Sequence, residues 1–309
     1  MQKIIAIQID PVEGLNYRTD TSAALGAEAE RRGYRVFCYQ PHALTLKNGA
    51  VFATGNFVSF APDNNPPYKV LENAVLNLFD IAAVLMRQDP PFNMDYITAT
   101  YFLEMVAEKT RVINNPTAVR NNPEKLLPLA FPKFAPPTVI TRSYSEVEAF
   151  FKEHKDIVIK PLYLYGGKGV FRFKESLNLK ALHEFFQISL SEPMVVQKYL
   201  PEVETADKRV IIINGKVIAA MQRIPEAGEI RANTRVGGSI AKTELTASEQ
   251  EVSETVAAYL KEKDIFIAGL DLIGGWLTEV NITSPTGIRL LNGLYDMNIE
   301  KIFWDEFEK

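Results

Sequence analysis

The chain of 309 residues has few of the residues that carry nucleophilic or zinc chemistry. Cys38 is its only cysteine, which excludes an internal disulfide and favours a reducing compartment. Cys38 stands in the apolar run Val36–Tyr39, where a small buried side chain is a simpler interpretation than a reactive thiol. The three histidines, His42, His154 and His183, lack the spacing of metal ligands. These absences argue against a zinc site and against a histidine-based catalytic triad.

Long apolar runs and a strong charge imbalance are also missing. No stretch approaches the roughly 18 apolar residues of a membrane span, and Met1–Asp10 lacks the basic start and apolar core of a signal peptide. The formal net charge of −4 indicates neither a nucleic-acid surface nor a polybasic membrane patch. We therefore expect a cytoplasmic protein without nucleic-acid or membrane partners.

The first 121 residues alternate between predicted strands and helices. Apolar runs typical of buried strands occur at Ile4–Ile7, Arg35–Tyr39, Ile81–Met86 and Arg111–Ile113. Helical patterns lie between them, over 20–32 and Tyr96–Lys109. This alternation predicts a parallel sheet in a doubly wound, Rossmann-like α/β domain over 1–121.

A proline-rich segment then interrupts the pattern and predicts a domain boundary. Its prolines are Pro123, Pro128, Pro132, Pro136 and Pro137. A small α+β domain is expected over 122–193, with three strands and a helix near Leu177–Leu190. A strand-rich third domain is expected over 194–309, with hairpins around Asn214-Gly215 and Gly274-Gly275. The second half of the chain is thus predicted to be α+β.

The second of these hairpins carries a candidate metal site. Glu279 and Asn281 stand two apart on a predicted strand, so both side chains point to the same face. A three-residue loop over 274–276 would place Asp271 opposite Glu279, whereas a two-residue turn would pair Asp271 with Thr278. Two carboxylates and an amide oxygen on one face suit Mg²⁺ held together with phosphates. An amphipathic hairpin with its acids in water is an equally good interpretation of this segment alone.

A glycine-rich loop follows the predicted strand that ends at Lys160. The glycines Gly166, Gly167 and Gly169 allow backbone amides to turn toward a phosphate, and the loop could close over a nucleotide. No helix begins after a Gly-Lys-Ser/Thr string, so the loop is not a Walker P-loop. A purely structural turn is the alternative.

A third group of polar residues follows another apolar run. Gln197, Lys198, Tyr199 and Leu200 form a short segment whose backbone donors and acceptors suit the edge of an adenine, and the nearby Asp207 suits ribose hydroxyls. Arg209 and Arg223 flank the Asn214-Gly215 hairpin. Two fixed guanidinium groups could stabilise a charged phosphoryl intermediate, although ordinary surface charge is the alternative.

Arg87 ends a predicted parallel strand, where open α/β sheets bind ligands. There its guanidinium could grip a substrate carboxylate with two hydrogen bonds.

Several strings occur together, in the order and at the spacings of the ATP-grasp ligases. The chain resembles this superfamily and, within it, the bacterial glutathione synthetase family over essentially its whole length. The strings that carry the resemblance are Met86-Arg87-x-Asp89-Pro90-Pro91-Phe92, Asn122-x-Glu124-Lys125, Ile159-Lys160-Pro161-Leu162, Gln197-x-Tyr199-Leu200-Pro201, Asp207-Lys208-Arg209-Val210 and Leu277-Thr278-Glu279-Val280-Asn281-Ile282-Thr283-Ser284-Pro285-Thr286.

The resemblance implies that ATP is held between the second and third domains. Lys125, Lys160 and the glycine loop would contact the nucleotide, Gln197 to Leu200 its adenine and Asp207 its ribose. Asp271, Glu279 and Asn281 would hold Mg²⁺, with Mn²⁺ as an alternative. Arg209 and Arg223 would stabilise the transferring phosphate.

The same resemblance implies the substrates and the reaction. ATP would phosphorylate the cysteinyl carboxylate of γ-glutamylcysteine, and glycine would then displace phosphate from the acyl phosphate. Arg87, Ser284, Pro285 and Thr286 would contact the peptide, and the loop Pro225–Gly238, with Arg231, would cover the site. A homo-oligomer, a tetramer in the family, is expected. The alternatives are an ATP-grasp ligase for another acid or a protein terminus, and a non-catalytic ATP-binding module.

Overall fold

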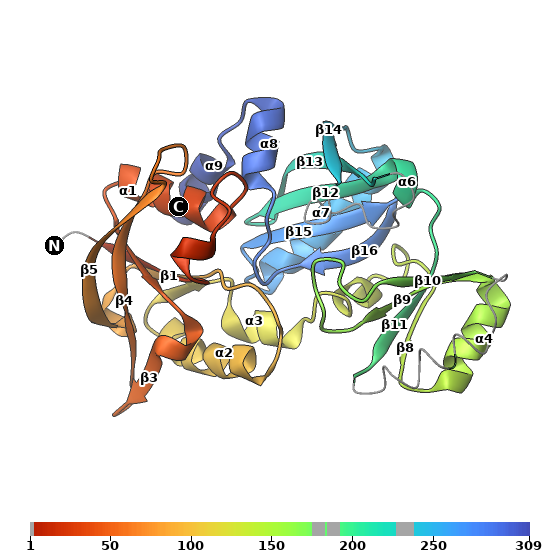
Figure 1. Ribbon diagram of the computed structural model, residues 1–309, viewed down its shortest axis with the longest axis horizontal. Coiled ribbons are helices and arrows are strands. Elements are labelled where there is room, and N and C mark those ends of the chain that lie inside the picture. The colour runs from red at the N-terminus through yellow and green to blue at the C-terminus, as the bar shows by residue number, and fades with distance from the viewer. Residues whose placement is uncertain (1–2, 175–182, 184–191, 227–237) are drawn as a thin grey trace.

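The computed structural model describes residues 3–174, 183, 192–226 and 238–309, arranged around three β-sheets (Figure 1). The predicted helix near Leu177–Leu190 lies, apart from His183, outside the described residues. No helix in the described ranges is long and apolar enough to cross a membrane.

The N-terminal sheet contains the four predicted parallel strands. They are β1 (Ile4–Gln8), β2 (Arg35–Tyr39), β6 (Ala83–Met86) and β7 (Arg111–Ile113), in the order β2-β1-β6-β7. Their apolar side chains are buried, which is why each appears in the sequence as a short continuous apolar run.

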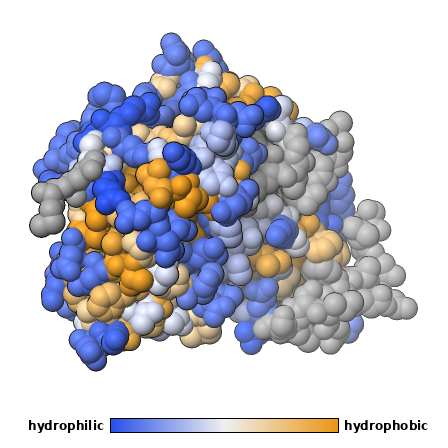
Figure 2. All heavy atoms as spheres, turned by 60° about the vertical axis from the view of Figure 1, so that its left-hand side comes forward, coloured by the Kyte–Doolittle hydropathy of each residue, from blue (hydrophilic) through white to orange (hydrophobic). Residues whose placement is uncertain are grey.

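The sheet is mixed rather than wholly parallel, which corrects the sequence prediction. Three further strands, β3 (Leu44–Lys47), β4 (Ala50–Phe60) and β5 (Tyr68–Asn77), extend it to seven, and β4 runs antiparallel to β2. Their mixed apolar and polar patterns are those of a half-exposed hairpin, because β5 leaves Val70, Leu71 and Val75 at the surface. Hydrophobic side chains are accordingly interspersed with hydrophilic ones on this side of the molecule (Figure 2).

Helices cover both faces of this sheet. They include α1 (Thr21–Arg31), whose predicted cap Asp20 accepts a 2.7 Å hydrogen bond from the Ala23 amide, α2 (Met94–Ala107) and α3 (Pro116–Asn121). Short 3₁₀ turns occur at Val12–Gly14, Pro41–Ala43, Leu78–Asp80 and Leu127–Ala130.

The second sheet is antiparallel and has a hydrophobic core of its own. Its strands are β8 (Thr138–Thr141), β9 (Asp156–Pro161), β10 (Phe171–Lys174) and β11 (Met194–Lys198), in the order β10-β9-β11-β8. The helix α4 (Tyr144–His154) buries Val147 and Phe151 against the sheet, in a cluster separate from the rest of the core.

The third sheet is also antiparallel and lies above the second in the view of Figure 1. Its strands, in the order β14-β13-β12-β15-β16, are β12 (Asp207–Ile213), β13 (Lys216–Ile224), β14 (Ser239–Lys242), β15 (Ile267–Ile273) and β16 (Trp276–Asn281). The helices of this part are α6 (Val203–Ala206), α7 (Ala247–Glu262), α8 (Ile288–Tyr295) and α9 (Ile299–Phe307). The predicted capping box of Thr246 and Glu249 begins α7.

The first and third sheets share their hydrophobic cores. One cluster runs from β6 and α2 into β12, β15 and α7, and another joins β1 and α1 to α8 and α9. Trp304 on α9 donates a 2.9 Å hydrogen bond from Nε1 to the Leu25 carbonyl on α1. The N-terminal sheet and the β12–β16 sheet therefore form a single packed body.

The side chain of Asn114, buried just beyond β7, joins the N-terminal sheet to the hairpin of β15 and β16 by hydrogen bonds. Its Nδ2 donates to the carbonyls of Ile267 and Ile282, both at 2.8 Å, and its Oδ1 accepts from the Ile267 amide at 2.9 Å. One amide side chain thus connects the end of the N-terminal sheet to both strands of the hairpin.

We expect Asn114→Ala to lower the free energy of unfolding by about 1–3 kcal/mol, because buried backbone groups of Ile267 and Ile282 lose their partner. The matched control is Asn73→Ala, which removes an exposed amide with two hydrogen bonds and should change stability by less than about 0.5 kcal/mol. Urea denaturation of both variants measures the difference, and equal losses would contradict the role assigned to Asn114.

Candidate nucleotide and metal site

The hairpin of β15 and β16 has the shorter of the two turns considered from the sequence. Gly274 and Gly275 form a two-residue turn with positive φ values of 56° and 86°, a backbone that glycine adopts easily. Of the two turns that the sequence left open, the three-residue loop does not form. On its own, a two-residue turn would pair Asp271 with Thr278.

A β-bulge restores the pairing that the turn would have lost. The register shifts between Asp271 and Leu272, so Thr278 is the extra residue and Asp271 pairs with Glu279. The Thr278 hydroxyl donates a 3.1 Å hydrogen bond to the Asp271 carbonyl. Asp271 and Glu279 thus stand side by side, as predicted, by a route the sequence reasoning missed.

Two arginines from neighbouring strands neutralise the buried acids. Arg209, opposite Asp271 on β12, binds its carboxylate through both Nε (2.5 Å) and Nη2 (3.0 Å). Arg223, opposite Asp207, donates to that carboxylate at 2.5 Å and lies 3.3 Å from Asp271. All four side chains are buried, so each charge depends on its partners.

The two carboxyl groups respond oppositely to this environment. Burial raises the pKa of Asp207 above its usual range, even though Arg223 opposes the shift. Burial alone would also raise the pKa of Asp271, but the charges of Arg209 and Arg223 outweigh it and lower that pKa. Asp271 is therefore held as a carboxylate between two guanidinium groups.

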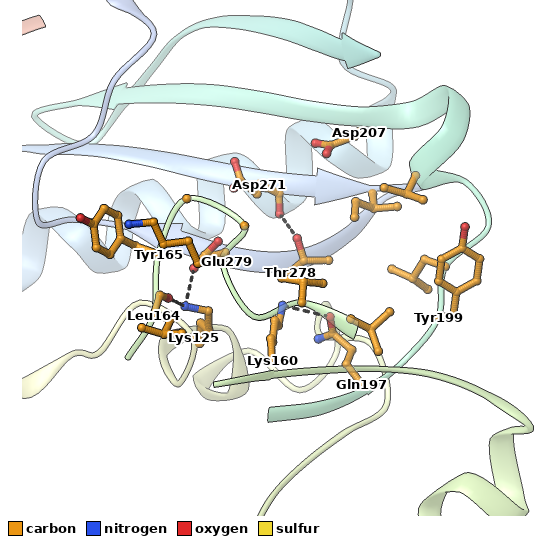
Figure 3. A pocket seen from close by; sticks show the side chains of 18 of the residues that line it. Lys125, Lys160, Leu164, Tyr165, Gln197, Tyr199, Asp207, Asp271, Thr278 and Glu279 are labelled. Carbon is orange, nitrogen blue, oxygen red and sulfur yellow. Dashed lines mark hydrogen bonds and ion pairs between the residues drawn. The ribbon is translucent and has the colours of Figure 1, made fainter. Parts of the chain in front are cut away.

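Two lysines lie close to the β16 strand, Lys125 beside Glu279 and Lys160 beside Gln197 (Figure 3). Lys125 donates to the carbonyls of Leu162 and Leu164 and lies 3.4 Å from a carboxylate oxygen of Glu279. Lys160 donates to Oε1 of Gln197 at 3.4 Å. Burial lowers the pKa of Lys160, and the nearby positive charge of Lys125 lowers it further. The negative charge of Glu279 partly offsets this shift.

A cavity of about 160 Å³ lies between the second and third sheets. Polar groups of both signs and a few apolar side chains line it: Lys125, Lys160, Gly166, Gly167, Gln197, Lys198, Tyr199, Leu200, Asp207, Arg223, Asp271 and Glu279. Gly166, Gly167 and Gly169 all have positive φ, between 65° and 77°, so the loop adopts a backbone that favours glycine. A second cavity of about 120 Å³ adjoins the first and reaches Arg209, Asn281, Ser284, Pro285 and Thr286.

A larger cavity of about 410 Å³ lies beside Arg87, at the carboxyl end of β6. The buried guanidinium donates to the Ser22 hydroxyl and the Pro285 carbonyl, both at 3.0 Å. Its Nη1 has no hydrogen-bond partner among the described residues. Burial lowers the pKa of Arg87, and the charges of Asp20 and Asp89 oppose that shift.

The structure brings nearly all the predicted site residues to these cavities. Gly169 flanks the first cavity without lining it, and Arg231 lies outside the described residues. Sequence reasoning gave no role to Thr278, the bulge residue, or to Glu124, whose carboxylate accepts hydrogen bonds at the end of β16. Glu124 was visible only as part of the string Asn122-x-Glu124-Lys125. The bulge left no signal in the sequence.

Two family models match the chain. The N-terminal domain of prokaryotic glutathione synthetase matches residues 4–120, and the ATP-grasp domain of the same family matches residues 124–296. The chain is therefore an ATP-grasp ligase, an enzyme that depends on ATP. Within that class it belongs to the prokaryotic glutathione synthetase family. The predicted family, fold class and ligase activity are confirmed.

Full-length relatives agree with this assignment. The glutathione synthetase of Mesorhizobium japonicum is 41% identical over 100% of this chain and 99% of its own length. That of Vibrio vulnificus is 36% identical over 99% of this chain and 97% of its own.

Solved structures share the fold at lower identity. D-cycloserine synthetase aligns with a TM-score of 0.66 at 16% identity over 96% of each chain. D-alanyl-alanine synthetase A from Vibrio cholerae aligns with a TM-score of 0.62 at 15% identity, over 98% of this chain and 97% of its own.

We expect Asp271→Ala to lower the free energy of unfolding by about 3–5 kcal/mol, because it leaves Arg209 buried without its bidentate partner. Glu279→Ala should cost less than about 1 kcal/mol, because the more exposed Glu279 makes a single 3.4 Å ion pair among the described residues. Its partner Lys125 keeps its hydrogen bonds to the carbonyls of Leu162 and Leu164. Urea denaturation without nucleotide compares the two variants. Equal losses would show that the arginine–aspartate cluster does not hold this sheet together.

Proposed function

We propose that this enzyme joins γ-glutamylcysteine to glycine, and that the cavity between the second and third sheets binds ATP and Mg²⁺. The observation that carries the proposal is the meeting of four cations, Lys125, Lys160, Arg209 and Arg223, around the paired acids Asp271 and Glu279. Such a balance suits a polyphosphate held together with a divalent cation.

The donors present fit Mg²⁺. Asp271 and Glu279 supply carboxylate oxygens. Asn281 donates from Nδ2 to Asp271 and to the Gly269 carbonyl, so its amide oxygen is directed away from these acceptors. In our proposal these three residues hold Mg²⁺, or Mn²⁺ as a substitute, and the bound cation would neutralise charge on phosphate oxygens.

The remaining cavity residues have proposed roles toward the nucleotide. Lys125, Lys160 and the loop with Gly166, Gly167 and Gly169 contact the phosphates, with Lys160 also close to the adenine. Gln197, Lys198, Tyr199 and Leu200 line the adenine. Both hydrogen bonds from Arg223 reach Oδ1 of Asp207, so Oδ2 is the atom that we assign to a ribose hydroxyl.

The chemistry needs no side-chain nucleophile. A carboxylate oxygen of the cysteinyl residue attacks the γ-phosphorus of ATP, the bond from that phosphorus to the bridging oxygen breaks, and ADP leaves. The amine of glycine then attacks the carbonyl carbon of the acyl phosphate and loses a proton, while inorganic phosphate leaves with the bonding electrons. Arg209 and Arg223 stabilise charge on the transferring phosphate, and the glycine loop keeps water from the acyl phosphate.

The cavity at Arg87 suits the γ-glutamyl end of the peptide. A buried guanidinium with Nη1 directed at no described acceptor suits a carboxylate, and Asp10, Asp20 and Asp89 along the same cavity suit an ammonium group. Ser284, Pro285 and Thr286 line the passage from here to the metal site, and we assign Arg231 to the loop that covers it. The peptide would thus span from the N-terminal sheet to the phosphates.

We propose a division into three domains, 1–121, 122–193 and 194–309, with the second closing over ATP. The separate core of the second sheet supports setting that domain apart, although β11, which pairs with β8 and β9, extends it to Lys198. The first and third domains share their hydrophobic clusters. We also propose a homo-oligomer, a tetramer, on the basis of the family resemblance of the sequence. A cytoplasmic location is proposed because the single cysteine suits a reducing compartment.

We expect the purified enzyme with ATP and Mg²⁺ to release ADP only when γ-glutamylcysteine and glycine are both present, and to form glutathione. Glu279→Gln should lower kcat/KM by about 10²–10³-fold, a typical loss for one charge-stabilising group. Glu251→Gln, on the exposed face of α7, is the matched control and should keep the wild-type rate. Coupled ADP detection and mass spectrometry provide the readouts. ADP release with a different acid or amine, and none with this pair, would reject the proposed substrates.

Arg87→Lys should raise the KM for γ-glutamylcysteine by roughly 10- to 100-fold while the KM for ATP stays unchanged, because lysine keeps the charge but cannot make two parallel hydrogen bonds. Arg289→Lys, at a surface ion pair with Asp63, is the control. Steady-state kinetics with each substrate varied in turn would refute the assignment if both KM values rose equally.

A further inference from the structure

Glu124 forms hydrogen bonds with the backbone on both sides of Asn281, a proposed metal ligand. Its carboxylate Oε1 accepts three hydrogen bonds, from the Ile282 amide at 2.7 Å and from the amide and hydroxyl of Thr283, both at 2.9 Å. Its own carbonyl accepts from the Val280 amide at 3.1 Å. The residue between these contacts is Asn281.

The backbone after Asn281 needs hydrogen-bond partners from outside the hairpin, because the pairing of β15 with β16 ends at that residue. Asn281 forms the last pair of β15 and β16, opposite Gly269, so the amides of Ile282 and Thr283 have no partner in the sheet. At the other end, the register already shifts at the Thr278 bulge. Turn and ladder together therefore do not fix the direction of the chain after Asn281. Glu124 fixes it through the amides of Ile282 and Thr283, while Asn114 binds the Ile282 carbonyl.

The segment that follows is held from the opposite side. The Ser284 hydroxyl donates to the Arg87 carbonyl at 3.1 Å, and Arg87 donates to the Pro285 carbonyl. The next residue after Glu124, Lys125, pairs with Glu279. The Glu124-Lys125 pair thus touches the backbone beside one proposed metal ligand and the carboxylate of another.

We propose that Glu124 is a positioning residue for the metal site, and that it acts through the backbone of 280–283 to aim Asn281 and Glu279 at the cation. The inference rests on the proposed metal role of those two residues. The proposed role depends on the length of the Glu124 side chain rather than on its charge, because three donors must meet one oxygen at the end of that side chain. Glutamine keeps this reach without the charge, whereas aspartate keeps the charge without the reach.

The experiment measures Mn²⁺ binding to the full-length protein in the presence of ADP, by electron paramagnetic resonance of the free ion. We expect Glu124→Asp and Glu124→Ala to weaken Mn²⁺ binding by roughly 10- to 100-fold, the usual effect of losing a residue that orients metal ligands. Glu124→Gln should bind Mn²⁺ nearly as the wild type does. The affinity for ADP measured without metal should not change in any of the three.

Glu30→Asp is the matched control, because Glu30 also accepts a backbone hydrogen bond, 2.8 Å from the Phe60 amide, but does so far from the site. Its Mn²⁺ affinity should equal that of the wild type. If a Glu124 variant does not fold, Thr283→Val replaces it: this change removes one of the three donors and should weaken Mn²⁺ binding severalfold.

Three results would overturn the proposal. They are wild-type Mn²⁺ affinity in the Glu124→Asp or Thr283→Val protein, loss in Glu124→Gln without loss in Glu124→Asp, and an equal loss in Glu30→Asp. Glu279→Gln, measured alongside, tests the proposed metal site separately. If that variant binds Mn²⁺ as the wild type does, the metal assignment itself is wrong, whatever Glu124 does.

Discussion

A buried cluster of two arginines and two aspartates is the interaction on which the rest of the site depends. Arg209, Asp271, Arg223 and Asp207 lie on three adjacent strands, and each neutralises a charge that the interior of the sheet would not otherwise tolerate. The same charges are those that phosphates and a divalent cation would engage. The sheet therefore holds these four side chains in place by using them as one another's counterions. Under the proposed function, nucleotide binding competes with these ion pairs.

The geometry of the hairpin beside this cluster depends on one extra residue. A tight glycine turn alone would put Glu279 on the wrong face, and the bulge at Thr278 moves it back beside Asp271. A bulge changes the face to which side chains point only locally. The far end of the strand therefore needs hydrogen bonds of its own to hold it in place. Asn114 and Glu124 provide them by binding the backbone around Ile267, Ile282 and Thr283.

Packing divides the molecule into one large body and one smaller one. The N-terminal sheet shares its hydrophobic clusters with the β12–β16 sheet, which keeps Arg87 and the β15–β16 hairpin at a set separation. The β8–β11 sheet has its own cluster, and the segment that follows β9 is linked to the rest of the molecule by the hydrogen bonds of Lys125 to the carbonyls of Leu162 and Leu164. A unit of this kind can change its position over a nucleotide without disturbing the main core.

By itself, the sequence determined the parallel strands, the helix caps, the position of both hairpins and the residues that would meet, because apolar runs, Asp20, the Thr246–Glu249 capping box and glycine pairs are local signals. It also identified the family through strings spread over the whole length.

Only the tertiary structure decided the mixed character of the N-terminal sheet, since β4 and β5 have half-exposed patterns without a clear period. Only tertiary structure decided the bulge and the role of Glu124 as well. Both depend on hydrogen bonds between segments far apart in the chain, and Glu124 and Thr283 are separated by 159 residues. Local patterns contain no information about such contacts, because the partner is chosen by packing rather than by neighbouring residues.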